Sequence, residues 1–134
     1  MKQLSFAEEY RYPDDLTGIP IEVILSHGAQ SVEITAAVDP GASVCLFANE
    51  VGQALDLRVE QGVPIRLKTL GGPLDAYGHE VTIQTGEIEF ESFVYFAKYP
   101  GLPRNLLGRA GWLRKLRLAL VDYDNLLYFS EYGA

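Results

Sequence analysis

The sequence predicts an all-β protein, a single domain whose many short strands form a closed or nearly closed barrel. Stretches in which apolar and polar residues alternate recur along most of the chain, and segments rich in glycine, proline and aspartate separate them. A length of 134 residues suits one domain, and a hydrophobic content of 48% supplies one core. We expect one or two short helices among the strands.

The first strands are predicted to form a hairpin. Apolar residues recur at every second position from Ile19 to Ser26 and again from Val32 to Val38, which is typical of strands with one buried face. The segment 27–30 between them, His-Gly-Ala-Gln, indicates a turn. The second strand is expected to end at the turn signal 39–41, Asp-Pro-Gly.

A short helix and a longer hairpin are expected next. Asn49 is predicted to cap a helix from Glu50 to Leu55. Strand patterns then run from Val63 to Leu70 and from Tyr77 to Thr85. Because Gly71-Gly72-Pro73 lies between them, the sequence predicts a hairpin with a glycine-rich tip.

The last third of the chain is expected to add a strand with a solvated glutamate face, a loop, a short buried segment and a closing hairpin. The ranges are a strand at 88–97, a loop at 99–103, a buried segment at 105–109, a short helix around Trp112 to Leu116, and hairpin strands at 118–121 and 126–129. We assign residues 1–18 to an N-terminal arm, which we expect to be loosely ordered through Asp14 and Asp15, and residues 19–134 to the domain.

Composition and charge argue against several function classes. With 18 acidic and 11 basic residues the net charge is −7, so we expect no nucleic-acid partner. No apolar stretch approaches the roughly 18 residues of a spanning helix, and no secretion signal is visible. The single Cys45 cannot form an intrachain disulfide, which favours a reducing compartment. We therefore expect a cytoplasmic protein that does not bind membranes.

Metal and thiol chemistry have no support in the sequence. His27 and His79 lie far apart, and with one cysteine they make no cluster of ligands. We expect Cys45 to be a small core residue rather than a nucleophile, and we expect no cofactor.

Asp39 carries the functional hypothesis. Taken alone, Asp39-Pro40-Gly41 is a common turn signal, since aspartate bonds its own downstream backbone and proline presets φ. The order of the motifs along the chain adds to this signal. The segment 37–43, which contains Asp39, precedes the glycine-tipped hairpin, and the segment 106–109, Leu-Leu-Gly-Arg, follows the hairpin. In that order the motifs resemble those of the retropepsins, the single-domain aspartic proteases of the retroviral type. The resemblance covers roughly Ile19 to Phe129.

The resemblance implies an acid-protease barrel with a flap hairpin, and it implies roles for particular residues. Asp39 matches the catalytic aspartate, Gly41 and Ala42 match the tight loop beneath it, and Ser43 matches a residue that lines the cleft. Gly71 and Gly72 match the tip of the flap. Leu107, Gly108 and Arg109 match a segment packed behind the loop, in which the arginine has a structural role. Tyr77 on the returning flap strand is a candidate substrate contact, although packing is the commoner role of an aromatic residue on a half-buried strand.

The chemistry needs two carboxyl groups, one to protonate the scissile carbonyl and one to take a proton from water. Two aspartates about 3 Å apart share one proton because they cannot both ionise. This chain offers one such loop, so the resemblance implies a homodimer with two copies of Asp39 and a peptide or protein substrate. The other candidate acids lie in the polar tail and in a turn, and we interpret them as solvated: Asp14, Asp15, Asp122 and Asp124.

Pro40 departs from the family pattern, which has threonine or serine at this position. Proline has neither a hydroxyl nor an N–H group, so the hydrogen bonds that join the two active-site loops are missing; each is worth about 0.5–1.5 kcal/mol. Three hypotheses follow: a homodimeric aspartic endopeptidase, a catalytically silent relative that binds peptides or proteins, and an unrelated small β-barrel with a structural or interaction role.

Overall fold

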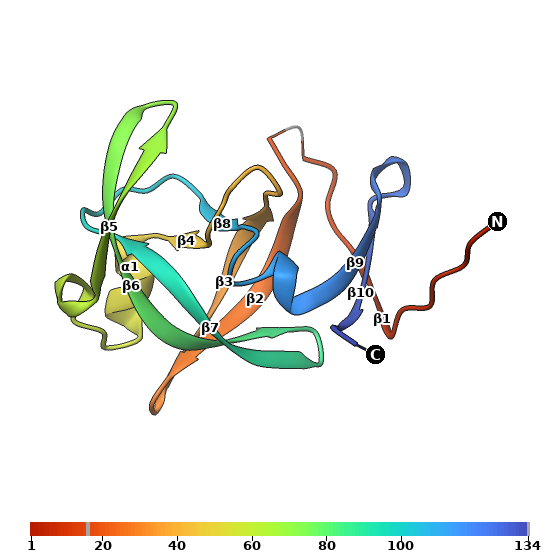
Figure 1. Cartoon of the computed structure of the whole chain (residues 1–134), viewed down its shortest axis with the longest axis horizontal. Coiled ribbons are helices and arrows are strands. Elements are labelled where there is room, and N and C mark those ends of the chain that lie inside the picture. The colour runs from red at the N-terminus through yellow and green to blue at the C-terminus, as the bar shows by residue number, and fades with distance from the viewer. Residues whose placement is uncertain (16, 134) are drawn as a thin grey trace.

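The computed structural model describes residues 1–15 and 17–133 of the chain (Figure 1). The helical elements in these residues are α1 (Asn49–Ala54) and three 3₁₀ turns, η1 (Val59–Gln61), η2 (Leu113–Lys115) and η3 (Asp122–Asp124). The strands are β1 (Glu8–Arg11), β2 (Pro20–His27), β3 (Gln30–Val38), β4 (Leu46–Phe47), β5 (Val63–Thr69), β6 (Gly72–Thr85), β7 (Ile88–Ala97), β8 (Asn105–Leu107), β9 (Leu116–Val121) and β10 (Leu126–Glu131).

Six strands close into a barrel that mixes parallel and antiparallel pairs. Their order is β2-β3-β8-β4-β7-β6, and a pairing between β2 and β6 closes the ring. Strand β5 lies outside the ring and pairs with the first half of β6, so the two strands form a hairpin that projects from the barrel (Figure 1). The predicted all-β class and closed barrel are confirmed.

Alternating side chains fill the barrel. In β2 the side chains of Ile21, Val23 and Leu25 are buried, as the period of two predicts. On β7 the glutamates Glu89 and Glu91 are exposed, which confirms the expected solvated face of that strand. Burying one face of each strand around a common axis gives one continuous core.

Helix α1 begins one residue earlier than expected, and Asn49 does not cap it. Ala48 is the N-cap, while Asn49 lies in the first turn with its side chain buried. The Asn49 Nδ2 group donates to the carbonyl oxygens of Ala97 (3.0 Å) and Lys98 (3.1 Å) at the end of β7. Asn49 therefore ties the helix to the barrel.

The second expected helix is only the 3₁₀ turn η2. Gly111 before it has φ +106°, a left-handed conformation that a continuous α-helix does not contain. The turn leads into β9, which forms the predicted closing hairpin with β10.

The N-terminal segment forms strand β1, although the sequence indicated a loosely ordered start. This strand pairs antiparallel with β10, which completes a three-stranded sheet in the order β1-β10-β9. The sheet lies beside the barrel (Figure 1). Trp112, just before the turn that leads into β9, is fully buried, and its Nε1–H donates to Thr85 Oγ1 on β6 at 3.0 Å. We call these three strands the terminal sheet. Within the residues described, no helix is long and apolar enough to cross a membrane.

Candidate active site

Asp39 lies where β3 leaves the barrel, in a tight turn built by its own backbone. Its N–H donates to the carbonyl oxygen of Leu107 (2.9 Å), and its carbonyl oxygen accepts from the N–H of Ala42 (3.1 Å). The N–H of Gly41 donates to Asp39 Oδ1 at 2.9 Å. Asp39 is half-buried, and the N–H of Gly41 holds one of its carboxylate oxygens in place. Pro40, on the outside of this turn, is exposed.

A second segment runs behind this loop and is bonded to it. The N–H groups of Arg109 and Ala110 donate to the carbonyl oxygens of Ala42 and Ser43, both at 2.9 Å. Gly108 lies so close to the loop that an added Cβ would approach the carbonyl oxygen of Val44 to 2.1 Å. Only glycine fits this backbone contact, which explains the Gly-Arg pair that the sequence singled out.

The structure brings the predicted supporting residues together with Asp39. Leu107 is fully buried beneath the loop. Arg109 bonds the loop through its backbone while its side chain is exposed, an arrangement that suits a structural residue. Cys45 is fully buried, and burial raises the pKa of its thiol to about 11, so the thiolate that a nucleophile needs does not form at neutral pH.

The β5–β6 hairpin and the loop that follows β7 enclose a hollow of about 360 Å³. Gly71 and Gly72 at the hairpin tip both line it, and Gly72 adopts φ +111°, which requires glycine there. The sequence indicated the loop at 99–103 only as a connection, because nothing in its composition shows that it faces the hairpin. The walls are completed by Thr69, Pro73, Leu74, Asp75, Ala97, Tyr99, Pro100, Gly101, Leu102 and Pro103.

Other candidate residues lie outside this hollow. Asp39 and Ser43 are not among its lining residues, so the single chain presents the aspartate loop and the hollow as two separate features. Tyr77 is half-buried, pairs with Phe96 and packs against the core, while it also lines a smaller recess at the base of the hairpin. Tyr77 therefore has the contacts of a packing residue.

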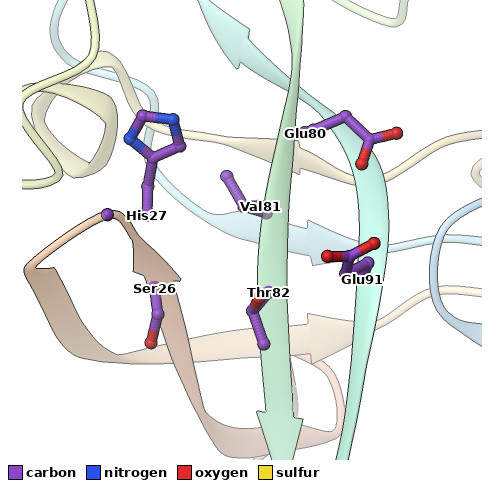
Figure 2. Close-up of a pocket in the computed structure, with 7 residues that line it drawn as sticks. Ser26, His27, Glu80, Val81, Thr82 and Glu91 are labelled. Atoms are coloured by element: carbon purple, nitrogen blue, oxygen red, sulfur yellow. The ribbon is translucent and has the colours of Figure 1, made fainter.

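A different hollow, of about 220 Å³, lies at the β2–β6 junction (Figure 2). Figure 2 shows His27 on one side of it and the carboxylates of Glu80 and Glu91 on the other. His27 ends β2 at the turn into β3, whereas Asp39 follows the other end of β3. Nine strand residues span roughly 30 Å, so this hollow is remote from Asp39. No three histidine, cysteine, aspartate or glutamate side chains in the described residues lie close enough to hold a metal ion.

A closed mixed barrel, a strand that ends in an aspartate loop, and a projecting glycine-tipped hairpin together define the retropepsin-like type of acid-protease fold. A family model described as aspartyl protease matches residues 19–110, which is more than half of the chain. The chain therefore belongs to the aspartyl protease family.

Two solved structures show the same fold. A retropepsin-like aspartic protease from Rickettsia conorii is 20% identical and matches with a TM-score of 0.66 over 92% of this chain and 99% of that one. EIAV protease in complex with the inhibitor HBY-793 is 18% identical and matches with a TM-score of 0.53 over 67% of this chain and 80% of that one. No curated protein matches the chain significantly.

Proposed function

We propose that the protein is a homodimeric aspartic endopeptidase that hydrolyses peptide bonds in extended segments. The observation that carries this proposal is the Asp39 carboxylate, retained at the end of a barrel strand in a loop that leaves it half-exposed. The loop restrains the carboxylate through Gly41 and is itself bonded to the segment at 107–110. A restrained carboxylate is positioned for proton transfer before substrate arrives.

The reaction requires a second Asp39 from another copy of the chain. One carboxylate, ionised, accepts a proton from the attacking water, while the protonated partner gives its proton to the scissile carbonyl oxygen. Water adds to the carbonyl carbon, and the resulting tetrahedral intermediate breaks at the C–N bond when the leaving nitrogen is protonated. Two closely spaced carboxyl groups hold one proton between them, which supplies both roles at once.

The hollow beneath the β5–β6 hairpin supports a preference for apolar substrate side chains. Leu74 from β6 and Tyr99 and Leu102 from the loop after β7 give it apolar walls. An apolar side chain that enters it leaves water at about 25 cal/mol per Å² of buried surface. In this proposal the hairpin is the flap, and it covers an extended peptide that lies across both aspartates.

The substitution Asp39→Asn tests the proposal. Asparagine keeps the size of the side chain and removes the proton chemistry, so cleavage of a mixture of unstructured peptides, followed by mass spectrometry, is expected to fall by roughly 10²–10⁴-fold. The matched control is Asp56→Asn, an exposed aspartate after α1, which is expected to cleave like the parent. A D39N protein that cleaves as fast as the parent would refute the endopeptidase proposal.

Pro40 favours a second candidate, a catalytically silent domain that binds peptides or proteins. Proline at this position has no side-chain hydroxyl and no N–H group with which to join two aspartate loops. The substitution Pro40→Thr separates the candidates. A large gain in cleavage identifies an impaired catalyst, whereas peptide binding without cleavage in both forms identifies a binding domain.

A further inference from the structure

The β5–β6 hairpin is attached to the barrel at its base, where η1 leads into β5. The turn η1 contacts both α1 and β6. Val59 in η1 is buried against the helix, since a Cβ added to Gly52 in α1 would lie 2.7 Å from Val59 Cγ2. Gly62 follows η1 directly, and β5 begins at the next residue. We call η1, Gly62 and the adjacent His79 of β6 the hairpin root.

One carbonyl group joins both strands of the hairpin at this root. The carbonyl oxygen of Val59 accepts from the N–H of Gly62, just before β5, at 3.1 Å. The same oxygen lies 2.8 Å from the ring Nε2 atom of His79 on β6. Because a carbonyl oxygen can only accept, Nε2 carries the hydrogen and donates it. The oxygen has two lone pairs, so it serves both strands at once.

The ring of His79 is positioned by packing on its neighbours. His79 is half-buried, and its ring meets the buried ring of Phe96 edge to face, with 5.9 Å between the centroids and an interplanar angle of 67°. Gly62 also lies against the ring, because an added Cβ would come within 2.7 Å of its Cδ2 atom and still closer to Nε2. Glycine at position 62 therefore leaves the room that the ring needs to reach Val59.

The rest of the hairpin has few attachments to the barrel. In the described range 63–75 every side chain is exposed or half-buried. The ion pair between Arg66 and Asp75 joins the two strands to each other. Strand β6 pairs with β7 only from Ala76 onwards, whereas β5 pairs with β6 alone. Strand β5 therefore depends on β6 and on the hairpin root for its position.

We propose that His79 is a positioning residue: its bond to Val59 fixes the hairpin beside the hollow of about 360 Å³ and so sets how tightly a substrate is held. The inference rests on the proposed function, in which this hairpin is the flap, for its effect on substrate. A hairpin that is fixed in advance loses less freedom when it closes on a peptide. His79 does not line the hollow, so its effect is expected in substrate affinity rather than in the chemical step.

The first test compares His79→Phe with His79→Gln by hydrogen exchange and mass spectrometry of the free protein. Phenylalanine keeps a ring against Phe96 and removes the donor, while the carbonyl of Val59 keeps its bond from Gly62. Glutamine keeps an N–H donor at about the reach of Nε2. Peptides that cover residues 63–78 are expected to exchange about tenfold faster in H79F, and at the parent's rate in H79Q.

His27→Phe is the matched control, because His27 is the other histidine of the chain and is exposed at the end of β2. It is expected to exchange like the parent. His79→Met is a second variant without the donor, with a side chain that adapts to irregular space, and is expected to match H79F. Thermal unfolding and the exchange of β2 and β3 establish that the variants fold. Hairpin exchange in H79F and H79M that equals the parent's, or in H79Q that equals that of H79F, would overturn the inference.

The second test is peptide cleavage by the parent and the same variants. H79F is expected to raise KM about tenfold and to change kcat less than twofold, and H79Q to restore KM. A fall in kcat as large as the rise in KM would contradict a positioning role.

Exchange is measured without substrate, so the two proposals can fail separately. A looser hairpin in H79F, with a parent that cleaves no peptide, would support the tie through His79 and refute the endopeptidase. Cleavage by the parent, with equal hairpin exchange in H79F and the parent, would do the reverse.

Discussion

At the scale of single residues, the candidate site depends more on backbone contacts than on side chains. Asp39 is held by the N–H of Gly41 and by the pairing of its own backbone with Leu107. Behind the loop, Gly108 allows two backbone segments to approach more closely than any side chain permits. The position of the Asp39 carboxylate therefore depends on neighbouring backbone groups.

Gly108→Ala is expected to destabilise the protein by about 1–3 kcal/mol, because the added methyl group forces the loop apart. Its Cβ would lie 2.1 Å from the carbonyl oxygen of Val44 and 2.8 Å from that of Ala42, and backbone atoms cannot move aside cheaply. Urea unfolding measures the effect. Gly71→Ala is the control, since its Cβ would meet only Thr69 Oγ1 at 3.8 Å. Equal stability of G108A and the parent would show that the loop relaxes freely.

Some of these residues could be recognised from sequence and others could not. Asp39 and Gly108 lie in short motifs whose order along the chain has meaning, so both were predicted. The role of Asn49 was missed, since it depends on carbonyl groups almost fifty residues away at the end of β7. Tyr99 and Leu102 were missed as lining residues because only the folded hairpin brings them opposite β6.

At the scale of elements, the N-terminal segment is fixed to the hairpin of β9 and β10. The buried Tyr12 follows β1, and its hydroxyl donates to Asp122 Oδ1 at 2.5 Å while its N–H donates to the carbonyl oxygen of Asn125. Burial, together with the bond to Asp122, raises the pKa of Tyr12 to about 12. The N-terminal segment is therefore bound with the hydroxyl of Tyr12 protonated.

This shift makes stability fall at alkaline pH. The pKa of Tyr12 is raised from about 10 in the unfolded chain, so its contribution is complete below pH 10 and is lost as pH rises towards about 12. Thermal unfolding from pH 8 to 12 is expected to show a smaller alkaline loss for Tyr12→Phe than for the parent. Tyr123→Phe, which changes a fully exposed tyrosine, is the control. Parallel curves for Y12F and the parent would contradict the prediction.

Most hairpins were predictable because strand periodicity and turn residues are both local signals. Strand β1 was not, since Glu8–Arg11 shows no clear apolar alternation and becomes a strand by pairing with the edge of β10. The second helix was predicted to be longer than it is, because the apolar residues from Trp112 to Leu116 have helical spacing. Gly111 limits the segment to one 3₁₀ turn.

At the scale of the whole molecule, one chain holds one aspartate loop, so the proposed active site is a property of the pair. The sequence implied this through the family resemblance. It could not show that β1 is paired with β10 of its own chain. If catalysis uses two copies of Asp39, chains that lack the carboxylate must inactivate the parent chains with which they pair.

Mixing experiments test this shared site directly. When the parent is equilibrated with an equal amount of D39N at concentrations where all chains pair, random exchange leaves about half of the parent chains in parent–parent dimers. Cleavage is therefore expected to fall to about half, and to fall further with more D39N. The matched control adds the same amount of D39N immediately before the assay, when the chains have not yet exchanged, and this addition should leave the rate unchanged. A rate that an excess of pairing D39N chains leaves untouched would mean that one carboxylate suffices.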